Sequence, residues 1–179
     1  ETFKGSIFHS GHWDHSVAYA GKRVGVIGSG CSAAQIVPAI AGKVSRLTLF
    51  MGKAQWILPR SDRQYGAVER LIRTLPSVRH IIRWLVFALY DIRFIGFRRY
   101  PGMSVVTRLI KDHYRRNLTK QLNRYIKDDK LRQHMLPDYE MGCRRVIPPN
   151  TYLPALSRAN VEVDVSGIDC ITPNGIRTK

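Results

Sequence analysis

The sequence predicts an α/β protein in which a βαβ unit comes first, a long helical stretch follows, and β structure returns near the end. Three observations lead to this prediction. A short β-branched run at 22–27 is followed by a glycine-rich turn and an apolar helical segment. Residues 66–134 repeat apolar side chains at helical spacing, and alternation typical of strands returns after Pro148. Hydrophobic residues make up 44% of the 179 residues, which excludes a disordered chain.

The elements of the βαβ unit follow from local sequence. Residues 22–27 are short, apolar and β-branched, as buried parallel strands are. Residues 28–33 form the turn, and residues 34–41 continue as a helix that Gly42 ends. Residues 46–50 are expected to form the second strand.

The middle of the chain is predicted to be helical. Apolar residues recur at spacings of three and four over 68–85, and Pro76 is expected to start or kink a turn. The most apolar stretch, 84–97, contains Asp91 and Arg93 and is shorter than the about 20 residues that a membrane-spanning helix needs. It is expected to be a core or interface helix, and contact with a membrane surface is the alternative.

The last part of the chain is expected to return to β structure. Residues 161–165 alternate apolar and acidic side chains, as a strand does. Residues 173–175 carry a hairpin-turn signal, and the returning strand is expected to begin near Lys179.

The charge is strongly positive. Lys and Arg number 29 against 13 Asp and Glu, so the net charge is +16. The basic residues are spread among apolar ones in the helical middle, which favours a solvated basic helix face over a nucleic-acid site. A basic module that binds nucleic acid or a membrane surface, with a steep salt dependence, is the non-enzyme alternative.

Neither a disulfide framework nor a metal site is expected. The cysteines form no CxxC pair, which points to a reducing, cytoplasmic compartment. Three histidines recur every third residue, but no pattern of Cys, Asp or Glu accompanies them. The residues concerned are Cys31, Cys143 and Cys170, and His9, His12 and His15. The chain opens without Met and without a signal-peptide pattern, so a fragment of a longer protein is expected.

A phosphate-binding loop is predicted between the first strand and the first helix. Gly28 would permit the tight turn, Gly30 would let the backbone approach a pyrophosphate, and Ala33 would allow close helix–strand packing. The remaining residues of this cofactor-binding loop are Ser29, Cys31 and Ser32. The helix N-terminus would offer N–H groups and partial positive charge to the phosphate. This strand–turn–helix context predicts a Rossmann-like dinucleotide-binding domain.

The segment after this loop favours NADPH over NADH. NAD sites place Asp or Glu about 20 residues after the loop, where it binds the ribose 2′-hydroxyl. No acidic residue occurs between His15 and Ser61. Four bases occur there instead, and they would attract a 2′-phosphate: Lys43, Arg46, Lys53 and Arg60.

The N-terminal segment carries a second motif. Its fixed positions match the pattern FxGxxxHxxxW(P/D), at Phe3, Gly5, His9, Trp13 and Asp14. The segment thereby resembles the fingerprint of Baeyer–Villiger monooxygenases, which are class B flavin-dependent monooxygenases. In that family the fingerprint precedes the NADP-binding loop, as it does here. The resemblance implies that the fingerprint is a structural linker between cofactor domains.

Further segments extend the resemblance over nearly the whole chain. Residues 47–50 and 55–60 resemble the family's second strand and the loop that follows it. Residues 129–145 resemble its Leu-Arg…Pro-Asp-Tyr…Gly-Cys-Lys-Arg run, and residues 152–161 resemble the next segment. The likeness is poorest over 66–127.

The resemblance also implies roles for basic residues. Arg145 matches the family's active-site arginine, and a guanidinium that stays protonated can stabilise an anion during catalysis. Arg144 stands where the family has Lys, and it is implied to bind the cofactor. Family members often carry Gln-Arg after the second strand, where this chain has Met51 and Gly52. Lys53 is the candidate that replaces this 2′-phosphate arginine.

The implied activity is that of an NADPH- and FAD-dependent monooxygenase. Such an enzyme inserts one oxygen atom from O2 into a small carbonyl substrate and converts a ketone to an ester or lactone. The alternative is an N- or S-oxygenating flavin-containing monooxygenase of the N,N-dimethylaniline type, which usually has Tyr or Phe where Trp13 stands.

The implied architecture is a flavoprotein with two dinucleotide-binding domains. Residues 1–20 would be the fingerprint linker, and residues 66–137 a helical insertion. Residues 21–65 and 138–179 would form the Rossmann-like NADP-binding domain, incomplete at its C-terminal end. The FAD site would lie largely outside these residues, in missing segments of the same chain, so the fragment alone is expected to be inactive.

Overall fold

The computed structural model describes residues 3–58, 64–95, 104–147 and 151–179. The chain divides into two compact units. The first combines Glu1–Pro59 with Leu118–Lys179, and the second is Arg60–Asn117. The domain boundaries expected from the sequence stay a prediction.

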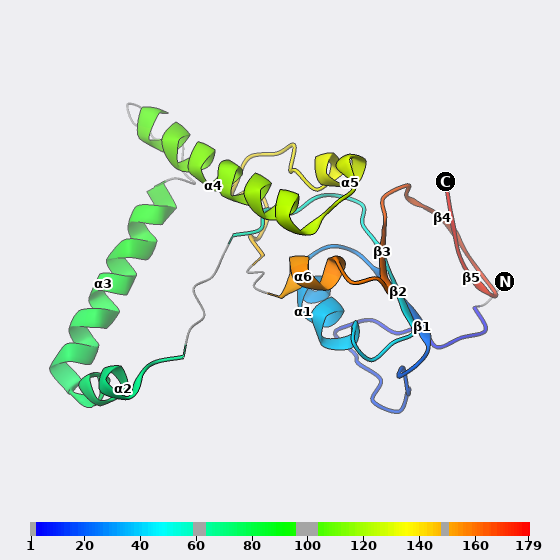
Figure 1. Ribbon diagram of the computed structural model, residues 1–179, viewed down its shortest axis with the longest axis horizontal. Helices are drawn as coiled ribbons and strands as arrows, with labels where there is room; N and C mark the ends of the chain where they lie inside the picture. Colours follow the sequence, from blue (N-terminus) through cyan, green and yellow to red (C-terminus); the bar gives the residue numbers. More distant parts are fainter. Residues whose placement is uncertain (1–2, 59–63, 96–103, 148–150) are drawn as a thin grey trace. The chain divides into compact units, whose positions relative to one another are not determined.

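A three-stranded parallel sheet forms the centre of the first unit (Figure 1). Its strands are β1 (Arg23–Ile27), β2 (Arg46–Phe50) and β3 (Val161–Asp164), side by side in that order. Leu47 and Leu49 of the central strand are fully buried. The parallel sheet with its helices confirms the predicted α/β class.

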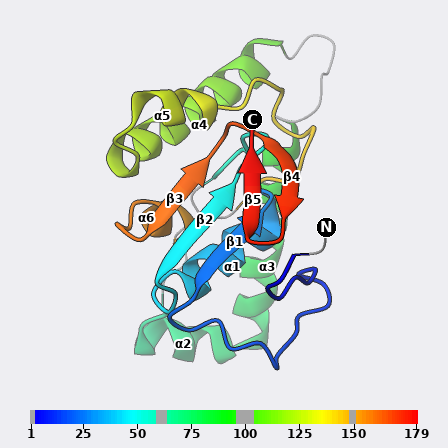
Figure 2. The same ribbon diagram turned by 90° about the vertical axis from the view of Figure 1, so that its right-hand side faces the viewer.

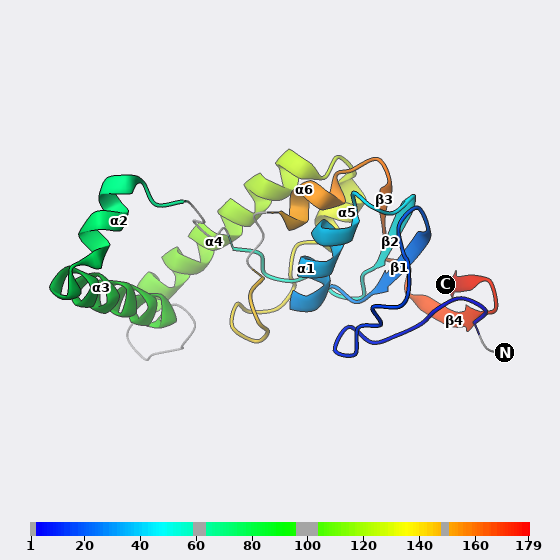
Figure 3. The same ribbon diagram turned by 90° about the horizontal axis from the view of Figure 1, so that it is seen from below.

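Helices lie on one face of this sheet, and a hairpin lies on the other side, where Gly25 and Ile27 of β1 stay exposed (Figures 2 and 3). On the helical face, α1 (Cys31–Ile40) packs beside α6 (Tyr152–Leu156). On the opposite face lie β4 (Ile168–Thr172) and β5 (Gly175–Thr178), which pair with each other. The hairpin lies beside β1, because a Cβ built at Gly25 would be in ordinary van der Waals contact with Ile176 Cδ1, at 3.8 Å.

The predicted strand at 46–50 is confirmed, and so is the strand that begins at Val161. The first helix begins at Cys31, three residues earlier than the expected Ala34. The expected start of the returning strand near Lys179 is wrong, because β5 already begins at Gly175, directly after a two-residue turn.

The helical middle is also confirmed. The second unit contains α2 (Ala67–Thr74) and α3 (Pro76–Ile95), and Pro76 is the first residue of α3. Helix α4 (Ser104–Tyr125) begins in the second unit and ends in the first, where α5 (Asp129–His134) follows it. In the first unit, Leu118, Leu122 and Ile126 are buried.

The second unit exposes apolar side chains along its helices. On α3 they form a stripe at helical spacing, which we name the α3 stripe: Ile81, Trp84, Leu85 and Leu89, each at least half exposed. On α2, Val68 and Leu71 are about 70% exposed. Across the described ranges, no helix combines the length and the apolar character needed to cross a bilayer.

Two leucines give a direct test of this distribution. Leu49→Ala, at a fully buried position, should lower the free energy of unfolding of the 179-residue chain by about 2–5 kcal/mol. Leu85→Ala, at a position 55% exposed, should change it by less than about 0.5 kcal/mol. Urea unfolding followed by circular dichroism measures both. Equal losses would show that the α3 stripe is covered.

Candidate functional site

The candidate site lies at the carboxyl edge of the parallel sheet. Because all three strands run in the same direction, the segments after β1, β2 and β3 meet at this edge. Ligands of open α/β sheets bind at the carboxyl ends of the strands. Here that edge carries the glycine loop after Ile27 and the segment after Phe50.

Two hydrogen bonds hold the glycine loop against the end of β2. Gly28 has a φ of +106°, a left-handed conformation that favours glycine. Its N–H donates to the Phe50 carbonyl oxygen at 2.9 Å. Ser29 is buried, and its hydroxyl donates to the Lys53 carbonyl oxygen at 2.6 Å. The loop and the Lys53 turn are therefore one connected structure.

The N-terminus of α1 is open to a ligand. Gly30 is the N-cap, and nothing lies within 4 Å of where its Cβ would be. The first helical bond joins the Ala34 N–H to the Gly30 carbonyl oxygen, which leaves the N–H groups of residues 31–33 without a partner inside the helix. No acidic side chain occupies the first turn, and Ala33 is buried. This arrangement suits an anion such as a phosphate.

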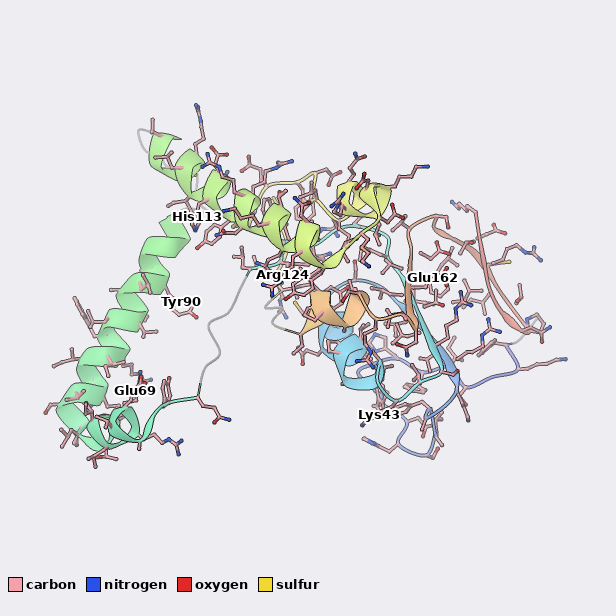
Figure 4. The ribbon with its side chains drawn as sticks, viewed as in Figure 1. Lys43, Glu69, Tyr90, His113, Arg124 and Glu162 are labelled. Atoms are coloured by element: carbon pink, nitrogen blue, oxygen red, sulfur yellow. The ribbon has the colours of Figure 1, made fainter. Side chains whose placement is uncertain are left out.

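The structure separates the four bases that the sequence places near the 2′ position. Lys53 follows the carboxyl end of β2, whereas Lys43 and Arg46 lie at its amino end, about 13 Å away along a five-residue strand. Arg46 pairs there with Glu162 of β3 at 2.6 Å (Figure 4 labels Lys43 and Glu162). The expectation is therefore wrong for Lys43 and Arg46, and Arg60 lies outside the described residues.

A second set of contacts ties the segment after Lys53 to residues 139–147. The Trp56 indole Nε1–H donates to the Tyr139 carbonyl oxygen at 3.0 Å, and the Tyr139 hydroxyl donates to the Ala54 carbonyl oxygen at 2.9 Å. The Ile147 N–H donates to the Trp56 carbonyl oxygen at 2.8 Å, and the Leu58 N–H donates to the Ile147 carbonyl oxygen at 3.0 Å. We call this set the Trp56–Tyr139 clamp.

Arg144 and Arg145, the two arginines that the sequence predicts to be functional, lie between Tyr139 and Ile147 of the clamp. Gly142, with a φ of +98°, makes the turn that precedes them. The Arg144 guanidinium carbon lies 5.2 Å from the centre of the Tyr139 ring. Arg145 is exposed, and within the part of the chain that the structure describes its side chain forms no ion pair or hydrogen bond. Burial raises the pKa of Tyr139 and Arg144 opposes the shift, so the hydroxyl stays protonated and can donate.

The first fingerprint residues make close local contacts. The Phe3 ring folds over Gly5, where a Cβ would lie 2.5 Å from the ring, so a larger residue there would have to displace the ring. The His9 ring accepts a hydrogen bond from the Gly11 N–H at its Nδ1, at 3.1 Å. Lys4 donates its N–H to the Pro173 carbonyl oxygen at 2.9 Å, which joins this segment to the hairpin turn.

The last fingerprint residues face α1 and the following turn. Trp13 packs edge-on against Tyr19, and both line a hollow of about 490 Å³ beside α1. Asp14 accepts hydrogen bonds from the Ser16 hydroxyl and N–H, which lower the pKa of its carboxyl. Over the described ranges, no three His, Cys, Asp or Glu side chains form a group that could hold a metal ion.

Two features of this edge could not be recognised along the sequence. Tyr139 contacts both basic segments although it lies 85 residues from Ala54. Asp164 ends β3 beside β2, and its carbonyl oxygen accepts the Met51 N–H at 2.8 Å. The Asp164 carboxylate accepts hydrogen bonds from the Ser166 N–H and hydroxyl. An acid from a strand far away in the sequence therefore lies at this edge.

Comparisons with known proteins agree with the fingerprint. Residues 1–83 match the family model described as "Flavin-binding monooxygenase-like". A Baeyer-Villiger monooxygenase of Streptomyces coelicolor is 39% identical over 170 residues, which cover 94% of this chain and 31% of that protein. One of Pseudomonas aeruginosa is 40% identical over 178 residues, covering 98% and 32%. The chain thus spans about a third of the length of these relatives.

A solved structure shows the same fold. The polycyclic ketone monooxygenase of Thermothelomyces thermophila matches with a TM-score of 0.79 at 21% identity, over 99% of this chain and 35% of that one. At this identity the match supports the fold alone. The sequence relatives confirm the resemblance that the fingerprint indicates. The first 83 residues thus match the flavin-binding monooxygenase-like family model, and the chain, along nearly its whole length, is similar to Baeyer-Villiger monooxygenases.

Proposed function

We propose that this chain is the NADPH-binding part of an FAD-dependent Baeyer–Villiger monooxygenase. The complete enzyme would insert one atom of O2 into a small carbonyl substrate and release an ester or lactone. The names of the relatives support the activity, and the carboxyl edge of the sheet supports the nucleotide. The three free cysteines agree with a reducing compartment such as the cytoplasm.

The observation that carries the proposal is the hydrogen bond from the Ser29 hydroxyl to the Lys53 carbonyl oxygen. It holds a cation-bearing turn beside the open N-terminus of α1. A nucleotide with its pyrophosphate at residues 28–33 would have its 2′-phosphate beside the segment after β2, as the geometry of βαβ units requires. Lys53 is the base in this position, and the Trp56–Tyr139 clamp adds Arg144.

These residues fit NADPH in their chemistry. Free N–H groups and a glycine without neighbours suit the pyrophosphate, while an ammonium and a guanidinium suit the 2′-phosphate. The carboxylate of Asp164, at the end of β3, accepts hydrogen bonds from Ser166. When bound, NADPH supplies the reducing equivalents, and FAD, held largely by other parts of the protein, supplies the oxygen chemistry.

Arg145 would act on the substrate side of the site. Its guanidinium stays protonated at any working pH. A fixed cation would stabilise the negative charge that develops during oxygen transfer. The turn at Gly142 and the hydrogen bonds of Ile147 hold its backbone on both sides.

The complete protein should prefer NADP⁺ to NAD⁺. Hydrogen bonds to a charged group contribute enough for the Kd of NADP⁺ to be at least about tenfold lower. Arg144→Ala should remove much of this difference, because NAD⁺ offers the arginine no 2′-phosphate. Arg46→Ala, at the opposite edge of the sheet, is the control and should leave it unchanged. Isothermal titration measures both constants, and equal constants in the wild type would contradict the proposal.

A gain of affinity is expected at Gly52. Nothing lies within 4 Å of where its Cβ would be, so a side chain can enter without displacing a neighbour. Gly52→Arg adds a guanidinium next to Lys53 and should lower the Kd of NADP⁺ by about 10-fold, with little effect on that of NAD⁺. The same titration measures it, and Gly52→Gln is the uncharged control. A similar gain with both substitutions would argue against a phosphate contact.

Loss of Arg145 should separate NADPH oxidation from product formation. Arg145→Ala should lower the rate of ester formation by about 10²–10³, the effect of removing one preorganised donor. NADP⁺ should bind as in the wild type, and the two electrons from each NADPH oxidised to NADP⁺ should reduce one O2 to hydrogen peroxide. Paired assays of NADPH, peroxide and ester measure this partition. Wild-type ester yield per NADPH would make Arg145 a surface charge without a catalytic role.

A further inference from the structure

The Tyr139 side chain contacts both basic segments of the site. Its ring lies under the Arg144 guanidinium, and its hydroxyl reaches the Ala54 carbonyl oxygen, one residue after Lys53. The tyrosine itself carries no charge at working pH, so it would act on a phosphate only through these two neighbours.

The ring restricts where Arg144 can go. Arg144 is exposed, and an exposed arginine samples many rotamers unless something holds it. The ring face at 5.2 Å from the guanidinium carbon is within the range of a cation–π contact. Such a contact offsets part of the ordering entropy before the phosphate arrives.

The hydroxyl restricts the Lys53 turn from the other side. The Lys53 carbonyl oxygen accepts the Ser29 hydroxyl, and the next carbonyl oxygen, that of Ala54, accepts the Tyr139 hydroxyl. The hydroxyl also lies 3.3 Å from Gln55 Oε1. Two consecutive peptide units are thus anchored by side chains, one from the glycine loop and one from the clamp.

The Tyr139 backbone is itself held in place. The Trp56 indole N–H donates to its carbonyl oxygen at 3.0 Å, and Trp56 is 5% exposed. The ring therefore projects from a fixed point, and its two contacts form a short continuous path from the glycine loop through Lys53 and Ala54 to Arg144.

We propose that Tyr139 is a positioning residue that sets the preference for the 2′-phosphate, by holding Arg144 with its ring and the Lys53 turn with its hydroxyl. This inference rests on the proposed NADPH site. According to this proposal, the preference for NADP⁺ over NAD⁺ depends on how Lys53 and Arg144 are positioned as well as on their charge. A side chain without charge then controls which nucleotide the site selects.

The test compares the ratio of the Kd of NAD⁺ to that of NADP⁺ in the complete FAD-loaded protein, by isothermal titration. Tyr139→Phe keeps the ring and removes the hydroxyl, and should lower the ratio about two- to tenfold. Tyr139→Leu also removes the stacking, and should lower it about two- to fivefold more. The Kd of NAD⁺ should stay within about twofold of the wild type, since NAD⁺ carries no 2′-phosphate for the two cations to bind.

A matched control and a double substitution separate positioning from general damage. Arg124 lies over the Tyr125 ring at 5.4 Å on α4, outside the site, so Tyr125→Leu removes the same kind of contact and should leave the ratio unchanged. In an Arg144→Ala background, Tyr139→Phe and Tyr139→Leu should give the same ratio, because no guanidinium is left to stack on the ring. If Tyr139→Leu does not fold, Tyr139→Phe and Trp56→Phe carry the test, and both should lower the ratio.

The outcomes are distinguishable. A wild-type ratio near one would overturn the proposed NADPH site and this inference with it. A high wild-type ratio that Tyr139→Phe and Tyr139→Leu leave unchanged would overturn only the role of Tyr139. Equal losses of affinity for both nucleotides would also overturn it, because they would indicate a structural role without selectivity.

Discussion

The hydrogen bond between the Ser29 hydroxyl and the Lys53 carbonyl oxygen is the contact on which the site depends. Parallel strands bring the ends of β1 and β2 to one edge, but they do not determine how the following loops lie. This bond, with that from Gly28 to Phe50, orders both loops together. The Trp56–Tyr139 clamp then adds the arginine segment to the same ordered edge, so elements from three parts of the chain form one surface.

The sequence predicts what local patterns determine. The strand at 46–50 follows from apolar spacing and lies where expected, and the glycine turn comes after the first strand as expected but gives way to α1 three residues earlier, at Cys31. The sequence does not show which end of a strand a base occupies in space. Lys43 and Arg46 lie close to Lys53 in sequence, yet the length of β2 separates them from the ligand edge.

The remaining features depend on long-range contacts. Tyr139 reaches Ala54 across 85 residues, and β3 brings Asp164 beside Met51. Neither partner can be identified from spacing, because a long helical unit lies between them. The second unit also exposes both apolar and basic side chains on one helix. The α3 stripe is apolar and exposed, and exposed basic residues such as Arg79 and Arg83 occupy other positions of the same helix. The net charge of +16 alone therefore does not indicate a partner.

The most direct test of the central claim is a crystal structure of the complete protein with NADP⁺ bound. The pyrophosphate should contact the N–H groups of residues 30–33 at the N-terminus of α1. The 2′-phosphate should lie within about 3.2 Å of the Lys53 ammonium or the Arg144 guanidinium, the distance of a hydrogen bond. A nucleotide bound elsewhere, or a 2′-phosphate that contacts Lys43 or Arg46 at the opposite edge, would contradict the account.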